Sequence, residues 1–151
     1  MSRREQIQMT ALEVDAFLAE QRVVICATNG TRGWPHLMPL WYLVRGEEIW
    51  AWTYAKSQKV RNLERDPRAT LQVEDGTEYA ELRGVMIEAE TVIHRDVHAV
   101  AALGQEIYAR YTGHSDVEEM IAAQAPKRIA LQFVPRRTTS WDHRKLGAGV
   151  Y

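Results

Sequence analysis

The sequence predicts a mainly β fold, a six-stranded antiparallel barrel with flanking helices, formed as one domain by residues 1–151. Short runs rich in β-branched and aromatic residues recur along the chain, and glycine-containing turns separate several of them, at 29–33, 45–47 and 75–76. Residues 79–94 alternate between polar and apolar side chains, as a half-buried strand does. A chain of this length can bury roughly two thirds of its unfolded surface, so its stability requires no second domain and no structural metal.

The N-terminal third is expected to contain one helix and three strands. Thr10 and Glu13 form a Thr-x-x-Glu capping box, and the helix that follows turns Val14, Phe17 and Leu18 inward. The strands are predicted at 23–28, 35–44 and 48–53.

A short helix is expected next, because Ser57 is a good N-cap and Pro67 cannot continue a helix. The remaining elements are strands at 69–74, 79–94 and 129–135, helices at 97–111 and 116–125, and a polar tail at 136–151. Gly84 is the predicted bend in the long strand at 79–94, since glycine in a strand often marks a bend.

Composition limits the partners and the compartment. The net charge is −1, which gives no overall attraction to nucleic acid or to an anionic membrane. Cys26 is the only cysteine, so no intrachain disulfide can form, and its place in an apolar run indicates a small buried hydrophobe. No apolar run approaches the length that spans a bilayer, and no signal-like segment is present. We therefore expect a cytoplasmic protein that acts on a small molecule.

The charge is distributed unevenly along the chain. Residues 56–68 contain five basic and two acidic side chains, and residues 127–145 contain six basic and one acidic, while 74–90 is acidic. Segregated charge of this kind can concentrate an anionic small ligand.

The turn after the third strand has the residue types of a phosphate site. Thr53 and Ser57 provide hydroxyls, and Lys56, Lys59 and Arg61 provide cations, all near an expected helix start. Free backbone N–H groups and the helix dipole favour an anion at such a position. The alternative is a solvated basic helix with an ordinary cap, and composition alone does not decide between the two.

Other chemistries find less support. His94 and His98 are four residues apart, but no further cysteine or carboxylate completes a metal-ligand set, so no metal is predicted. No glycine-rich nucleotide-binding motif is present. The carboxylates of 74–90 indicate an outward strand face, and the sequence identifies no catalytic residue.

Aromatic residues are concentrated in the second and third predicted strands. Core and dimer packing accounts for many of them, but a planar ring cofactor also needs a flat apolar wall with a few polar atoms. His36 fits either an ordinary strand position or a hydrogen bond to a ring carbonyl. The aromatic residues are Trp34, Trp41, Tyr42, Trp50, Trp52 and Tyr54.

The order of these motifs resembles a known family. The strand ending at Thr53, the segment Lys-Val-Arg-Asn-Leu at 59–63, Asp-Pro-Arg at 66–68 and the Gly84 strand follow one another as they do in the split-barrel flavin-binding superfamily that includes pyridoxamine 5'-phosphate oxidase. Within it, the chain is most similar to the flavin/deazaflavin oxidoreductase B group, the probable coenzyme F420-dependent enzymes. The resemblance implies an FMN-binding split β-barrel.

The resemblance also implies a set of cofactor-binding residues. The implied contacts of the ring are His36, Met38, Pro39, Leu40, Trp41, Ala51, Trp52 and Thr53. The implied phosphate ligands are Ser57 and Lys59, with Lys56, Val60 and Arg61 nearby, although many relatives have arginine where this chain has Ser57. Relatives are homodimers with the cofactor at the subunit interface, so Tyr79, Trp141 and Arg144 are expected to complete the partner's site.

The resemblance implies an F420-dependent oxidoreductase that transfers hydride between the deazaflavin and a small organic substrate. F420 is preferred over FMN because its tail adds negative charge, which suits the basic surplus at 56–68 and 127–145. Two alternatives stay open. One is an FMN-dependent oxidase or reductase, acting on a pyridoxal-like or tetrapyrrole substrate, and the other is a non-catalytic flavin or haem carrier.

Overall fold

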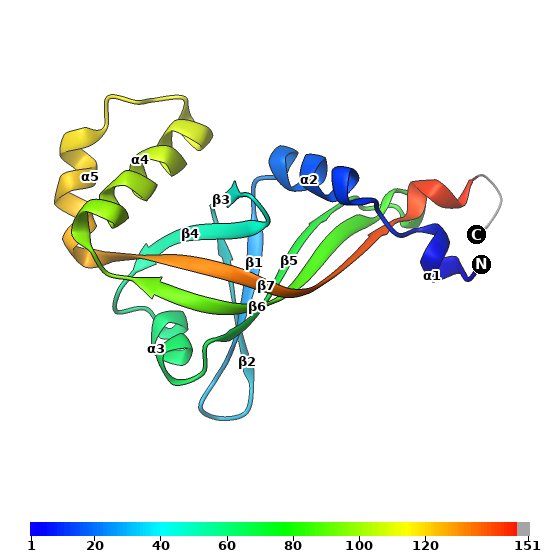
Figure 1. The fold of residues 1–151 in the computed structure, drawn as a ribbon, viewed down its shortest axis with the longest axis horizontal. Helices are drawn as coiled ribbons and strands as arrows, with labels where there is room; N and C mark the ends of the chain where they lie inside the picture. The colour runs from blue at the N-terminus through cyan, green and yellow to red at the C-terminus, as the bar shows by residue number, and fades with distance from the viewer. Residues whose placement is uncertain (148–151) are drawn as a thin grey trace.

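The mainly β prediction is confirmed by the computed structural model, which describes residues 1–147 (Figure 1). The strands are β1 (Val24–Asn29), β2 (Pro35–Leu40), β3 (Tyr42–Arg45), β4 (Glu48–Tyr54), β5 (Arg68–Asp75), β6 (Arg83–His94) and β7 (Arg128–Asp142). The α-helices are α1 (Arg3–Gln6), α2 (Ala11–Glu20), α3 (Gln58–Arg65), α4 (Val97–Thr112) and α5 (Glu118–Gln124), and the 3₁₀ turns are η1 (Tyr79–Glu81), η2 (Ala125–Lys127) and η3 (His143–Leu146).

The strands form one antiparallel sheet in the order β2-β1-β5-β6-β7-β4-β3. The two edge strands, β2 and β3, follow each other in the chain with only Trp41 between them. The sheet therefore curls so that one chain segment lies on both of its edges, which is a split barrel.

The predicted strand at 35–44 is wrong in one respect, because it is two strands. Trp41 interrupts it, and its indole lies flat on the Tyr111 ring of α4, with 4.4 Å between ring centroids. At Trp41 the chain passes from one edge of the sheet to the other, so the sheet has seven strands instead of the predicted six.

Of the last two strands, β6 is shorter and β7 is longer than the sequence predicts. β7 continues to Asp142, so residues 136–142 of the predicted polar tail are strand, whereas β6 begins at Arg83 rather than at residue 79. A β-bulge between Glu88 and Ala89 shifts the register, and Ala89 pairs with Pro135 there. Proline lacks an N–H, so a bulge lets the strand continue past it.

The register shift of β6 lies between Glu88 and Ala89, four residues beyond Gly84, so the predicted bend at Gly84 does not coincide with it. Gly84 pairs with Trp141 of β7, and a Cβ at position 84 would lie 2.3 Å from an atom of that indole. The glycine is therefore required by the packing of Trp141.

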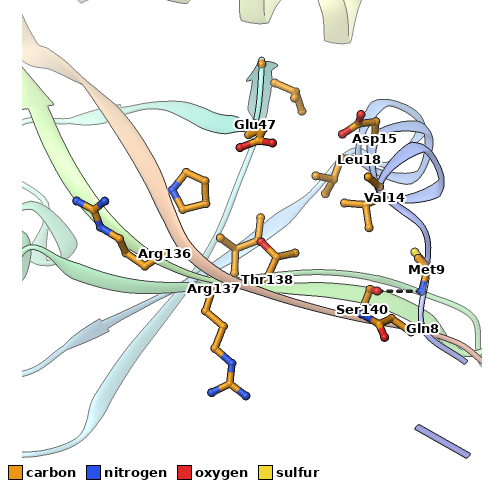
Figure 2. A pocket seen from close by; sticks show the side chains of 15 residues that line it. Gln8, Met9, Val14, Asp15, Leu18, Glu47, Arg136, Arg137, Thr138 and Ser140 are labelled. Atoms are coloured by element: carbon orange, nitrogen blue, oxygen red, sulfur yellow. Dashed lines mark hydrogen bonds between the residues drawn. The ribbon is translucent and has the colours of Figure 1, made fainter. Parts of the chain in front are cut away.

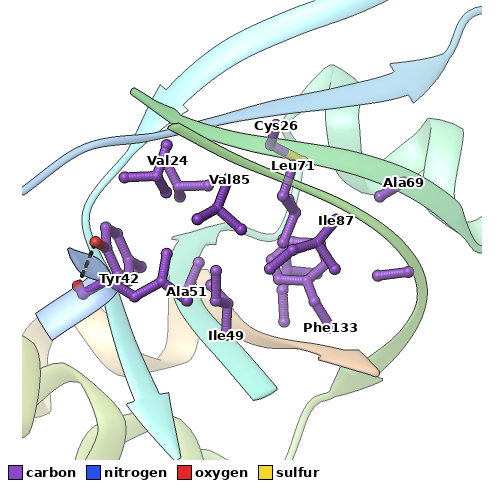
Figure 3. Close-up of a cluster of buried hydrophobic side chains, with 14 of the residues drawn as sticks. Val24, Cys26, Tyr42, Ile49, Ala51, Ala69, Leu71, Val85, Ile87 and Phe133 are labelled. Atoms are coloured by element: carbon purple, nitrogen blue, oxygen red, sulfur yellow. Dashed lines mark hydrogen bonds between the residues drawn. The ribbon is translucent and has the colours of Figure 1, made fainter. Parts of the chain in front are cut away.

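Two apolar clusters hold the fold together. The interior of the barrel contains side chains of β1, β4, β5, β6 and β7, including Cys26 (Figure 3). Phe17 and Leu18 of α2 belong to the same cluster. The second cluster lies between α4, α5 and the outer face of β4, with Trp52 against Gly104 of α4. Alternate residues of β4 thus face the two clusters.

Capping interactions and contacts with neighbouring elements fix the positions of the helices. The predicted Thr10–Glu13 capping box of α2 is confirmed, while the short helix α1 was not predicted. The guanidinium of Arg110 donates to main-chain carbonyls at the C-terminal end of α2, at 3.1 Å to Ala19 and 2.7 Å to Gln21, and this ties α2 to α4. Among residues 1–147, no helix is both long enough and apolar enough to span a bilayer.

Candidate functional site

Helix α3 closes one end of the barrel and turns two polar side chains inward. Lys59, Val60, Asn62 and Leu63 form its buried face. Of these, Lys59 donates from Nζ to the Thr53 hydroxyl at 3.0 Å, and Asn62 donates to the Thr28 hydroxyl at 3.0 Å. Val60, expected near the phosphate, lies instead in the barrel core.

Lys59 is an uncompensated buried cation. The residue is 5% exposed, and the described part of the chain offers its ammonium group no carboxylate within ion-pair distance. Burial lowers the pKa of the Lys59 amine, because the charged form is poorly solvated there. Buried charges in proteins are normally paired, so the missing anion is a notable feature of this site.

The residue before α3 has a free hydroxyl. Ser57 occupies the predicted N-cap position, with extended backbone, but its side chain makes no capping hydrogen bond. The Ser57 Oγ is buried and has no hydrogen-bond partner among residues 1–147. Lys56 and Arg61, on either side of it, are exposed. The start of α3 therefore presents an unpaired hydroxyl close to free cations.

Strand β2 provides an exposed wall beside α3. Leu37 is 58% exposed and Met38 is 40% exposed, while His36 is partly buried and its Nδ1 has no partner in the described residues. Pro39 is exposed and Leu40 partly buried, so most of the strand is open on both faces. A pocket of about 300 Å³ lies between the β1–β2 loop and α3, and its lining includes His36, Gln58 and Asn62.

Some predicted ring contacts lie elsewhere. Ala51 is fully buried in the barrel core, and Trp52 faces outward to α4 in the second cluster. Trp41 is 45% exposed and stacks on Tyr111. Only Thr53 of the three predicted β4 residues points to the same place as Lys59.

The three residues expected to serve a partner chain gather at the other end of the strands. Trp141 lies against Gly84 near the end of β7, Arg144 is in η3, and Tyr79 contacts the His143 ring, with centroids 4.6 Å apart. Figure 1 shows η3, in red, far from α3. The structure thus brings these three residues together, but it does not bring them to the β2–α3 region of the same chain.

Ion pairs neutralise part of the basic surplus at 127–145. Arg144 pairs with Asp142 at 2.7 Å, and Lys145 pairs with Glu13 at 2.6 Å. Arg144 holds the pKa of the Asp142 carboxyl below its usual value. Cations near α3 that form no ion pair within residues 1–147 include Lys56, Lys59, Arg61, Arg65, Lys127 and Arg128.

Arg128 was not predicted as a site residue. It is the first residue of β7 and pairs in register with Tyr54, at the end of β4. Its guanidinium carbon lies 3.8 Å from the Tyr54 ring centroid and 4.3 Å from that of Trp52. The only sequence signal for it is its membership in the basic stretch 127–145, because the partner ring is 74 positions away in the chain.

A pocket of about 380 Å³ lies away from the predicted site (Figure 2). It is lined by α2, by the β3–β4 turn and by β7, and it contains none of the predicted cofactor residues. Leu18 and Val14 point into it from α2, and Met9 donates its main-chain N–H to Ser140 Oγ at 3.0 Å. Within residues 1–147, no group of three or more potential ligand side chains could hold a metal ion.

Comparisons with known proteins agree with this fold. The family model described as pyridoxamine 5'-phosphate oxidase matches residues 11–142. The solved structure of a conserved hypothetical protein from Mycobacterium tuberculosis is 40% identical, with a TM-score of 0.90, and the match covers 100% of this chain and 96% of that one. No curated protein matches the chain.

Two more distant structures share the fold. An F420 reductase is 21% identical with a TM-score of 0.69, over 83% of this chain and 94% of that chain. An FAD-binding protein from Mesorhizobium loti is 20% identical with a TM-score of 0.68, over 88% of this chain and 94% of that chain. At these identities, the likeness extends to the fold alone.

Proposed function

The chain belongs to the pyridoxamine 5'-phosphate oxidase family, and on that premise we propose that it is an F420-dependent reductase of a small organic substrate. The cofactor would lie between the β2 wall and α3, with its phosphate at the start of α3. The F420 reductase among the structures of the same fold is consistent with this cofactor.

One observation supports a phosphorylated ligand above all others. Lys59 is a buried ammonium group without a carboxylate among residues 1–147, and the buried Ser57 Oγ nearby has no partner. An anion at the N-terminal end of α3 would satisfy both groups and would also meet the positive end of the helix dipole. The Lys59 ammonium group would bind this anion in place of its present hydrogen bond to the Thr53 hydroxyl.

The ring would lie on β2. Met38 and Leu37 give this strand an exposed apolar surface, and His36 has a buried ring nitrogen without a partner in the described chain. A planar ring placed there would cover the apolar atoms, and one of its polar atoms would pair with His36. Thr53, whose hydroxyl accepts from Lys59 where β4 meets α3, would lie beside the phosphate.

When reduced, a bound deazaflavin supplies a hydride to an organic acceptor, and the protein has to hold the two in contact and keep water out. The residues of β2 can keep water away from the ring if their outer side is covered. We propose that a second copy of the chain covers them, because β2 has exposed side chains on both faces. The copy's Trp141, Arg144 and Tyr79 would then approach the ring.

The second candidate is an FMN-dependent oxidase or reductase on the same site. One observation favours it. Arg144 and Lys145 are ion-paired, which leaves less free positive charge for the anionic tail of F420 than the sequence alone indicates. FMN needs the ring wall and the phosphate site only.

Titration of purified protein with F420 and with FMN distinguishes the candidates. We expect F420 to bind more tightly, and reduced F420 to be reoxidised in the presence of an enone or quinone acceptor. Protein that purifies yellow with flavin fluorescence, and binds F420 more weakly than FMN, would support the FMN enzyme. Light scattering should give about twice the chain mass of 17.4 kDa, and a monomer that still binds ligand would contradict the shared site.

A further inference from the structure

Arg128 lies beside the turn that begins α3. Its register partner is Tyr54, the last residue of β4, and the preceding Lys127 accepts a hydrogen bond from Ala55 N–H at 2.9 Å. The same turn continues through Ser57, whose N–H donates to the Tyr54 carbonyl at 3.1 Å. Arg128 and the start of α3 are therefore held together by the main chain.

The guanidinium of Arg128 is oriented but unpaired. Trp52 and Tyr54 hold it by ring contacts, and Tyr54 is 51% exposed, so solvent reaches this side of the turn. Within the described chain, the Arg128 side chain makes no ion pair and no hydrogen bond, and its Nε is buried without a partner. Arginine groups held flat against rings are suited to bind a carboxylate or phosphate through two N–H groups.

Arg128 adds a second positive charge to the same small region. Burial is the main cause that lowers the pKa of Lys59, and the charge of Arg128 lowers it further, so the two cations interact electrostatically. Two neighbouring cations repel, and neither has a carboxylate partner among residues 1–147. A bound anion would offset this repulsion.

We propose that Arg128 is a binding residue of this site and contacts an oxyanion group of the ligand, a phosphate or a carboxylate. The inference rests on the proposed function for the identity of the ligand, but the placement of Arg128 does not depend on it. Arg128 thus selects for ligands with negative charge at the α3 turn and against the uncharged flavin.

A purely structural role predicts something different. In that case Arg128 only packs on Trp52 and Tyr54, and its removal would lower stability without changing ligand preference. Arg45 supplies a matched control, because its guanidinium carbon lies 4.7 Å from the Trp50 ring centroid while its charge is paired with Glu106 at 2.9 Å. Arg45→Met removes the same charge and the same kind of ring contact.

The experiment compares wild type, Arg128→Met and Arg45→Met in titrations with F420, FMN and riboflavin. We expect Arg128→Met to weaken FMN or F420 by about 10- to 100-fold, the range of a lost charge-assisted hydrogen bond, and to leave riboflavin within about twofold. Weakening of both phosphorylated ligands identifies phosphate as the partner of Arg128, and weakening of F420 alone identifies a tail carboxylate. Arg128→Gln gives the same comparison if the methionine variant does not fold.

Unchanged binding of both anionic ligands in a folded variant, or an equal loss in Arg45→Met, would overturn the inference. If the wild type binds neither F420 nor FMN, the proposed function fails, and inorganic pyrophosphate then tests Arg128 alone. Thermal stabilisation by pyrophosphate that is present in wild type and lost in Arg128→Met supports the inference. Stabilisation that is equal in the two proteins, or absent from both, refutes it.

Discussion

Replacing Lys59 by methionine should stabilise the ligand-free protein while weakening its ligand. Lys59 is 5% exposed, and within residues 1–147 its ammonium group makes one hydrogen bond, 3.0 Å long, to the Thr53 hydroxyl. No carboxylate of residues 1–147 balances its charge. The unpaired charge therefore destabilises the ligand-free protein, and a bound anion would remove this destabilisation.

The expected size of the effect follows from two opposing contributions. The lost hydrogen bond costs about 1 kcal/mol, and removal of an unpaired buried ion recovers several kcal/mol. Methionine fills nearly the same space, so no large cavity adds to the cost. We expect a net gain of roughly 1–3 kcal/mol in the free energy of unfolding, and a loss of about 10- to 100-fold in affinity for FMN or F420.

The dependence on pH gives the comparison a second readout. Burial lowers the pKa of Lys59 in the folded protein from its ordinary value of 10.5. Between the folded pKa and 10.5 the unfolded chain binds more protons than the folded one, so the stability of the wild type rises with pH in that window. The variant lacks this rise, so its advantage should be largest at neutral pH and should shrink toward pH 10.5.

Urea denaturation followed by tryptophan fluorescence at several pH values measures both effects, and ligand titration completes the assay. Lys56→Met is the control, because Lys56 is exposed and its loss should change stability by less than about 0.5 kcal/mol. A Lys59→Met protein that is less stable than wild type at pH 7 and binds both cofactors normally would show that Lys59 serves only to close the barrel.

Three further predictions concern the fold and the charge around the site. Gly84→Ala should lower the free energy of unfolding by about 1–3 kcal/mol, because the added Cβ would lie 2.3 Å from the Trp141 indole. Calorimetry measures this loss. A loss below about 0.5 kcal/mol would mean that the indole moves aside. Arg110→Met should cost roughly 2–4 kcal/mol in urea denaturation, since several carbonyls at the end of α2 lose their donor, and an unchanged midpoint would refute that role. Lys56→Ser should reduce the salt dependence of F420 binding, whereas Arg144→Ser should not, because Arg144 is already ion-paired; equal slopes in both variants would contradict this assignment.

The sequence predicts much of this fold because several signals are local. The Thr10–Glu13 capping box, the strand at 48–53 and the N-cap position of Ser57 each depend on residues a few positions apart, and each agrees with the structure. Features that depend on distant partners were missed. Trp41, which stacks on Tyr111, interrupts a predicted strand, and β7 continues past Pro135 with a bulge in which Arg136 has no register partner in β6.

In the candidate site, too, the features that depend on neighbouring residues could be predicted, and those that depend on distant partners could not. The residue types around the α3 turn predict an anion site, and the structure does place a free hydroxyl and an unpaired cation there. The sequence could not show that Lys59 points into the barrel or that Trp52 points to α4, because both depend on which faces of α3 and β4 are buried. Arg128 was missed because its role depends on the pairing of β4 with β7.

The order of the strands has a consequence for folding. β7 is the only strand of residues 1–147 that pairs with both β6 and β4, and it begins at residue 128. Until it has been synthesised, the chain can form a sheet β2-β1-β5-β6 and a separate hairpin β3-β4, each with an unpaired edge. Exposed edges are templates for pairing with other chains, and non-local pairing is slow. The barrel is thus completed late, and a nascent chain that pauses before residue 128 is at risk of aggregation.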